Sequence, residues 1–102
     1  MDINALMRQA QSMQKQMAKK QKEVEEKEFV VSSNGGAIVI TIKGDKKILK
    51  IEIDEDLIDV DNKEMLQEML VIATNEAISK VEEAMAQAMN GATGGMNIPG
   101  FF

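Results

Sequence analysis

Residues 3–28 contain neither glycine nor proline and constrain the fold more than any other part of the chain. They consist largely of Met, Gln, Lys, Ala and Glu, which are good helix formers, so they predict one long helix. A helix of this length measures roughly 37 Å. The remainder of a 102-residue protomer is too small to cover one side of it, so we expect a second copy of the chain to supply part of its packing.

Apolar residues recur along this predicted helix every seven positions, as in a coiled coil. Ile3, Ala10, Met17 and Val24 hold one heptad position. The second position begins apolar and then changes to lysine, so the pattern predicts a seam that fades along the helix. Together with an apolar face on a second helix, the seam predicts a dimer interface that comprises Ile3, Leu6, Ala10, Met13, Met17, Leu66, Leu70 and Ala73.

Three β-prone segments follow, separated by turn sequences. The segments are residues 29–32, 37–43 and 48–53, and the turns are Asn34-Gly35-Gly36 and residues 44–47. In the middle segment, Ile38, Ile40 and Ile42 alternate with smaller or polar residues, and in the last segment Leu49, Ile51 and Ile53 alternate with Lys50 and Glu52. This alternation predicts a three-stranded antiparallel meander with one apolar face.

An acidic loop leads into a second predicted helix. Asp61, with Glu64 three residues later, fits a capping box, and apolar residues from Leu66 to Ala88 then form one helical face. Asn90-Gly91 predicts the end of the helix. The expected fold class is therefore α+β, an α-β-β-β-α protomer forming one domain over residues 1–102, in which residues 90–102 are a flexible glycine-rich tail.

The composition excludes several classes of function. The chain contains no cysteine and no histidine, which removes the commonest general base, the usual nucleophile pairs and the thiolate or imidazole metal ligands. The acidic loop fails as a calcium site because Asp59 stands where a glycine belongs. We therefore expect no enzyme activity, no cofactor and no metal. The sequence has no leader-like start and no apolar run long enough to span a membrane, so we expect a cytoplasmic protein.

Charge is distributed unevenly along a chain whose formal net charge is −5. Residues 52–68 hold eight acidic residues against Lys63, for a net −7. Around an ideal first helix, four cations instead form a stripe nearly opposite the seam, and we call it the basic stripe: Arg8, Lys15, Lys19 and Lys22. A stripe of cations without interleaved aromatic residues suits contact with DNA phosphates.

Two more ordinary interpretations of the charges remain open at this point. The basic stripe is also compatible with a solvated coiled-coil face, in which Lys19 pairs with Glu23 and Lys22 with Glu26. A second group of lysines flanks the predicted turn at residues 44–47, and charged residues at sheet edges also prevent aggregation. The members of that group are Lys43, Lys46, Lys47 and Lys50.

The order of these features resembles the YbaB/EbfC family of bacterial nucleoid-associated proteins. The resemblance covers essentially the whole chain and rests on LMRQAQSMQKQM, SNGGAIVITIKGDKKILKIEIDEDL, EMLQEMLVIATNEAISKVEEAM and TGGMNIPGFF. It implies an intertwined homodimer with projecting helices that binds double-stranded DNA in the nucleoid, without catalysis. Many members carry a basic residue where this chain has Ile40, and this departure shifts the expected DNA contact to the basic stripe.

A protein-interaction adaptor is the competing functional hypothesis, with a recombination or replication protein as its partner. The acidity of residues 52–68 favours a basic protein partner over DNA at that part of the surface. The tail raises a related question, because Met96, Ile98, Phe101 and Phe102 are poor choices for contact with water. Either the tail is a frayed terminus, or, as we expect, it docks on an apolar surface of the protein.

Overall fold

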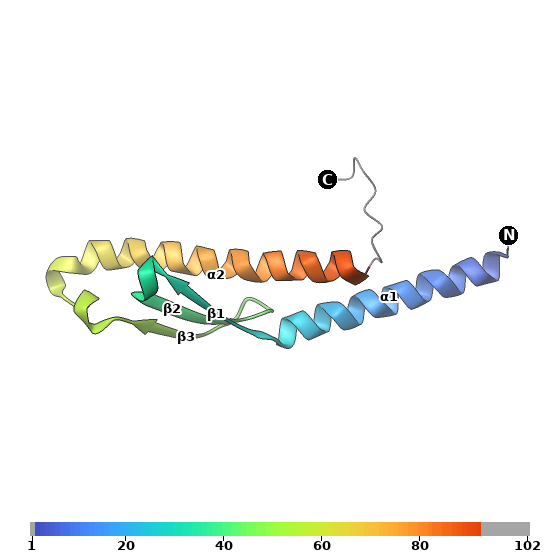
Figure 1. Cartoon of the computed structure of the whole chain (residues 1–102), viewed down its shortest axis with the longest axis horizontal. Coiled ribbons are helices and arrows are strands. Elements are labelled where there is room, and N and C mark those ends of the chain that lie inside the picture. Colours follow the sequence, from blue (N-terminus) through green and yellow to red (C-terminus); the bar gives the residue numbers. More distant parts are fainter. Residues whose placement is uncertain (1, 93–102) are drawn as a thin grey trace, which may run out of the picture.

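The computed structural model of the chain describes residues 2–92, so most of the predicted tail lies outside the described residues. The molecule is elongated, about 70 × 28 × 16 Å. Helix α1 precedes three strands, and helix α2 follows them, which confirms the predicted α-β-β-β-α order and the α+β class (Figure 1). The elements are α1 (Ile3–Glu26), β1 (Glu28–Ser33), β2 (Ile38–Lys43), β3 (Ile48–Ile53) and α2 (Lys63–Ala92), with short 3-10 helices at Asn34–Gly36, Glu55–Leu57 and Val60–Asn62.

Helix α1 begins at a side-chain cap and ends slightly earlier than predicted. The side chain of Asp2 accepts a hydrogen bond from the backbone N–H of Asn4 at 3.0 Å, which satisfies one of the free donors at the start of the helix. The helix ends at Glu26 rather than at residue 28. Lys27 is already extended, and Glu28 pairs with Lys43 as the first residue of β1.

The strands form an antiparallel sheet in the order β1-β2-β3, as predicted. The first turn uses residues with positive φ, namely Asn34, Gly35 and Gly36, and these are the residue types that tolerate this conformation. One detail differs from the predicted alternation. A register shift between Thr41 and Ile42 places Ile48 opposite Ile42, so that Leu49 is an extra residue on β3, as in a β-bulge.

The hydrophobic core lies between α2 and the strands β1 and β2. Ile38, Ile40 and Ile42 are fully buried, which confirms that they share one face of the sheet. Three small residues of α2, Ala73, Ala77 and Val81, are equally buried against them and allow the helix to approach the sheet closely. Ala73 was predicted at the dimer interface, but it belongs to the core of its own protomer because α2 turns it toward the sheet.

Both ends of α2 differ in detail from the prediction. The predicted capping box at Asp61 is replaced by a cap at Asp59, two residues earlier. There, the side chain of Asp59 accepts a hydrogen bond from the backbone N–H of Asp61 at 3.0 Å, and the short 3-10 helix Val60–Asn62 continues directly into α2. At the other end, α2 runs through the predicted stop at Asn90-Gly91 and reaches Ala92.

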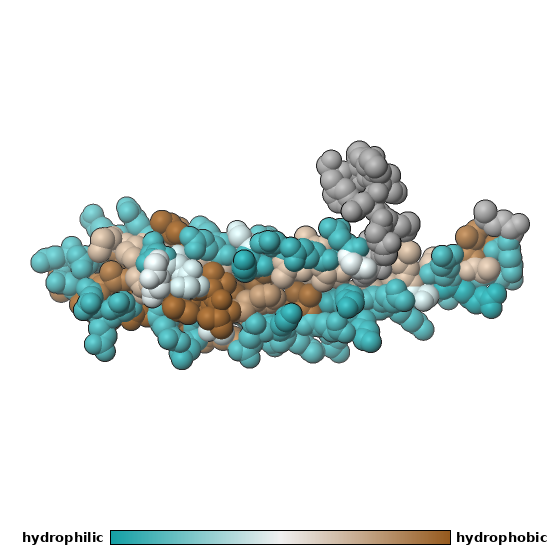
Figure 2. Space-filling model, viewed as in Figure 1, coloured by the Kyte–Doolittle hydropathy of each residue, from teal (hydrophilic) through white to brown (hydrophobic). Residues whose placement is uncertain are grey.

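Strand β3 is the part of the sheet that α2 leaves uncovered (Figure 1). Three of its apolar residues are substantially exposed: Ile48 at 40%, Leu49 at 51% and Ile51 at 43%. Figure 2 shows apolar side chains gathered over this sheet-bearing half of the molecule, and again near the N-terminal end of α1. An apolar strand at the open edge of a sheet is a surface that proteins normally cover.

Candidate nucleic-acid interface

Helix α1 forms an arm that is anchored only at its C-terminal end. Val24 is buried against the rest of the protein, whereas Met17 and Met13 are half-buried and the residues before them are exposed. The N-terminal part of α1 projects past the end of α2 (Figure 1). We call residues 3–22 the arm; they contain five cations and no acidic residue.

The basic stripe lies along this arm with all four side chains exposed. Arg8 donates a weak hydrogen bond from Nε to the carbonyl oxygen of Asn4 at 3.4 Å. The pairs expected of a solvated face, Lys19 with Glu23 and Lys22 with Glu26, are absent from the described residues. Glu23 instead lies 3.8 Å from the ammonium of Lys20. Within residues 2–92, no ion pair involves Lys15, Lys19 or Lys22. Their charges are therefore available to an anion from outside the protein.

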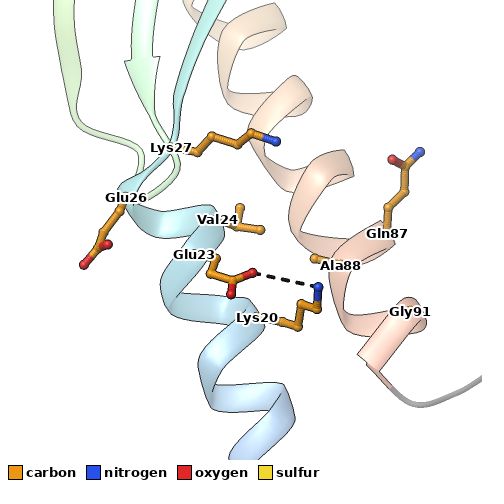
Figure 3. A pocket seen from close by; sticks show the side chains of 8 residues that line it. All are labelled: Lys20, Glu23, Val24, Glu26, Lys27, Gln87, Ala88 and Gly91. Atoms are coloured by element: carbon orange, nitrogen blue, oxygen red, sulfur yellow. Dashed lines mark ion pairs between the residues drawn. The ribbon is translucent and has the colours of Figure 1, made fainter.

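A cavity of about 600 Å³ lies where the base of the arm meets the end of α2 (Figure 3). Its lining is drawn from both helices: Lys20, Glu23, Val24, Glu26, Lys27, Gln87, Ala88 and Gly91. Two carboxylates accompany the two lysines, and the dashed line in Figure 3 marks the Lys20–Glu23 pair. This mixture of charges does not favour binding of an anion. The cavity is therefore a gap between two packed helices rather than a phosphate-binding pocket.

The lysines around the second turn are mostly neutralised by neighbouring carboxylates. Lys46 lies 3.4 Å from Glu82, Lys47 lies 3.9 Å from Asp45, and Lys50 lies 3.0 Å from Glu52. Surface pairs of this kind contribute little to stability, but they reduce the positive potential that a phosphate would meet. Of the two groups of cations, the basic stripe is therefore the better candidate for nucleic-acid contact.

The turn between β2 and β3 holds the base of the arm in place. The backbone N–H of Gly44 donates to the carbonyl oxygen of Lys27 at 2.9 Å. A Cβ at Gly44 would lie only 1.6 Å from the carbonyl oxygen of Val24 and would also meet the backbone of Glu25. Sequence analysis assigned Gly44 only to a turn, because nothing in a turn sequence indicates that another backbone passes this close.

We expect Gly44→Ala to destabilise the protein by about 1–3 kcal/mol, because the added methyl group must displace the backbone of α1. Denaturant unfolding at one fixed protein concentration measures the effect. Gly91→Ala is the matched control, since nothing lies within 4 Å of a Cβ there. Gly91 lies in the last turn of α2, so alanine there should raise stability by less than the roughly 0.5–1 kcal/mol gained in the middle of a helix. Equal stability of Gly44→Ala and the parent protein would contradict the anchoring role of the turn.

A dense group of acidic residues lies at the end of the molecule opposite the arm. Residues 54–64 connect β3 to α2 at that end, whereas the N-terminus of α1 lies at the other (Figure 1). Asp54, like Asp59, uses its side chain to accept a hydrogen bond from a nearby backbone N–H. The separation explains how a protein of net charge −5 presents a purely cationic arm.

Among the described residues, no group of His, Cys, Asp and Glu side chains is arranged to hold a metal ion. No helix in the same part of the chain has the length and apolar character to cross a membrane. The fold and the arm together define a small α+β protein with a projecting cationic helix, a class suited to binding a polyanion.

Comparison with known proteins identifies the family. Residues 1–96 match the model of the YbaB/EbfC DNA-binding family, and the chain belongs to that family. A nucleoid-associated protein of Clostridium novyi is 50% identical over 102 residues, which cover all of this chain and 90% of the relative. A nucleoid-associated protein of Clostridium acetobutylicum is 46% identical over 97% of this chain and 88% of the relative.

A solved structure shares the fold. The crystal structure of an uncharacterized protein from Helicobacter pylori superposes with a TM-score of 0.72 at 22% identity, covering 91% of this chain and 98% of that one. The family expected from the sequence resemblance and the α-β-β-β-α fold of the protomer are thus both confirmed.

Proposed function

We propose that this protein is a nucleoid-associated protein that binds double-stranded DNA, chiefly by contacts between the basic stripe and the phosphate backbone. The observation that carries the proposal is the exposure of Lys15, Lys19 and Lys22 on an arm without acidic residues. Membership of a family described as DNA-binding supports it, as do relatives named nucleoid-associated proteins. This function places the protein in the cytoplasm, at the nucleoid, and it requires binding rather than catalysis.

The geometry of the basic stripe suits a duplex backbone. From Arg8 to Lys22 the stripe extends roughly 21 Å along α1, which corresponds to about six base pairs at 3.4 Å each. Lysine is a point charge without the planar fork of arginine, and the chain contains no Trp or Tyr to stack on bases. Contacts of this kind position a protein on DNA without reading its sequence.

Binding to unrelated duplexes of equal length tests the proposal. Fluorescence anisotropy of labelled duplexes should give similar affinities for sequences that differ in base composition. Competition by an excess of unlabelled, unrelated duplex should displace the protein. Absence of binding to any duplex at low salt would overturn the proposed function, and strong preference for one sequence would overturn the phosphate mechanism.

We further propose that the protein acts as a homodimer, which would present two arms to one duplex. The exposed apolar residues of β3 support this, because an uncovered strand of this kind is a natural site for a second copy. Leu66 and Leu70 of the predicted interface lie at the rim of the core and line a neighbouring apolar groove with Ile58 and Val60. The predicted arm residues Ile3, Leu6, Ala10, Met13 and Met17 offer a second apolar surface, considered below.

Replacement of two β3 residues tests the dimer. We expect the double variant Ile48→Lys and Ile51→Lys to sediment with the mass of one chain at concentrations where the parent sediments as two, because buried lysines would be desolvated without a partner. Val30→Lys is the control, since Val30 is 71% exposed on β1. The control should remain dimeric. A double variant that keeps its secondary structure and still dimerises would exclude β3 from the interface.

The acidic end of the molecule is the feature that favours the adaptor hypothesis. A basic protein partner would be expected there rather than at the arm. Membership of a DNA-binding family favours the DNA function over this alternative.

A further inference from the structure

We infer that the apolar side chains of residues 96–102 dock on the exposed apolar seam of α1 in their own protomer, on the side of the arm opposite the basic stripe. The arm seam consists of Ile3, Leu6, Ala10, Met13 and Met17. The proposal names the occupant of this surface and does not depend on DNA binding. Residues 93–102 lie outside the described part of the chain, whereas the arm seam and the end of α2 that precedes these residues lie within it.

The arm seam continues a face that α2 already covers at its base. Val24 is 9% exposed, and it lines the same cavity as Ala88 and Gly91 of α2. Met17, Ala10 and Ile3 follow Val24 at intervals of seven residues and so lie on the same face of α1. Toward the N-terminus this face becomes uncovered, since Leu6 is 45% and Ile3 is 71% exposed. The contact between α1 and α2 therefore ends where α2 ends, whereas the apolar seam continues along α1 to Ile3.

The direction of α2 and the length of the remaining chain both fit this surface. The two helices run antiparallel, so the C-terminal end of α2 points toward the N-terminal end of the arm (Figure 1). Gly91 and Lys20 line the same cavity, and from Lys20 to Ile3 the arm extends roughly 26 Å. The ten residues after Ala92 span up to about 33–36 Å when extended.

Other apolar surfaces fit the same segment less well. The groove beside Leu66 lies at the far end of α2, roughly 39 Å behind Ala92 by helix geometry, which exceeds the reach of ten residues. The exposed residues of β3 require the chain to reverse direction along α2, and the proposed homodimer occupies them. The arm seam is the apolar surface toward which the C-terminal end of α2 points (Figure 1).

The chemistry of the two partners is complementary. Residues 93–102 contain no charged residue and include Met96, Ile98, Phe101 and Phe102. The arm seam is likewise uncharged, whereas the basic stripe lies about 180° around the helix. Docking on the arm seam buries apolar area on both partners and leaves the basic stripe free for phosphates. It also supports a projecting helix that otherwise lacks packing along most of its length.

Disulfide trapping tests the inference cleanly because the chain has no cysteine of its own. One cysteine is appended after Phe102, which keeps both phenylalanines, and a second replaces either Ala10 or Ser12. Ala10 lies on the arm seam, and Ser12 lies at a similar level but about 160° around the helix. Under mild oxidation, the Ala10→Cys protein should close a disulfide within one chain several-fold faster than the Ser12→Cys protein.

Three results would overturn the inference. Equal rates at the two positions would show that the arm seam does not receive the segment. Covalent dimers from the two-cysteine protein would show that the segment docks on a second copy. Covalent dimers from Ala10→Cys alone would show that two arms form a coiled coil through the arm seam.

Deletion of Met96–Phe102 provides an independent measurement. Backbone amide exchange in residues 6–17 of the full-length protein should become several-fold faster after the deletion, while exchange in β2 stays unchanged. Unchanged exchange in the arm would contradict docking. DNA binding by the basic stripe is measured separately, so failure of the docking and failure of the proposed function are distinguishable.

Discussion

Neutralising Lys15, Lys19 and Lys22 together by replacement with Gln should abolish most DNA binding at low salt. Each lost phosphate contact removes a released counterion, which weakens binding by roughly tenfold at about 0.05 M salt. Three lost contacts per arm therefore weaken binding by roughly a thousandfold in this range. The slope of log affinity against log salt should become shallower by about three for each arm that is engaged. Anisotropy titrations at several salt concentrations measure both quantities.

The matched control replaces the three paired lysines of the second turn, Lys46, Lys47 and Lys50, with Gln. This variant changes the net charge by the same amount, but its lysines already face Glu82, Asp45 and Glu52. We expect its affinity to stay within a few-fold of the parent protein. If both triple variants lose binding equally, the overall charge rather than the basic stripe governs the interaction.

Ile40→Ala should cause the largest loss of stability among single substitutions in the sheet. Ile40 is fully buried between the strands and α2, and removing its outer carbons leaves a cavity that costs about 2–5 kcal/mol. For a chain of this size, each kcal/mol corresponds to about 4–8 °C in the melting temperature. Val30→Ala, at a position that is 71% exposed, should change stability by less than about 0.5 kcal/mol.

Urea unfolding at a fixed protein concentration measures both variants, because the stability of the proposed dimer would depend on concentration. A small effect of Ile40→Ala would mean that α2 collapses into the vacated space. That outcome would contradict a core built on close contact between isoleucines and alanines.

The sequence predicts the core well because its signal is periodic. Ile38, Ile40 and Ile42 repeat at the period of a strand, and Ala73, Ala77 and Val81 repeat at the period of a helix. Each set forms one face, so the burial of both faces could be predicted without coordinates. The basic stripe is predictable for the same reason, since four cations on one side of a helix require only the helical period.

Features that depend on contact between distant residues were not predictable. The close approach of Gly44 to Val24 joins a turn to a helix that precedes it by twenty residues, and a turn glycine has the same sequence signal with or without such a neighbour. The bulge at Leu49 adds one residue to a strand whose sequence alternates normally. The choice of Lys20 over Lys19 as the partner of Glu23 reflects small differences between exposed side chains.

The placement of Ala73 illustrates a limit of periodicity. An apolar helical face predicts burial, but it does not state whether the partner is the same chain or a second copy. Ala73 was assigned to the dimer interface, and it lies instead beneath β2 within the protomer. Leu66 and Leu70, two turns and one turn earlier on the same face, are only partly covered. The size of the sheet, rather than the helical pattern, decides where burial within the protomer ends.

A salt titration of binding to one duplex tests the central claim most directly, namely that the arm binds DNA by its phosphates. If four cations of one arm are engaged, log affinity should fall linearly with log salt concentration with a slope of about −3.6, and with about twice that slope if both arms of a dimer are engaged. A second duplex of unrelated sequence should give the same line. An affinity that does not change with salt would contradict the account.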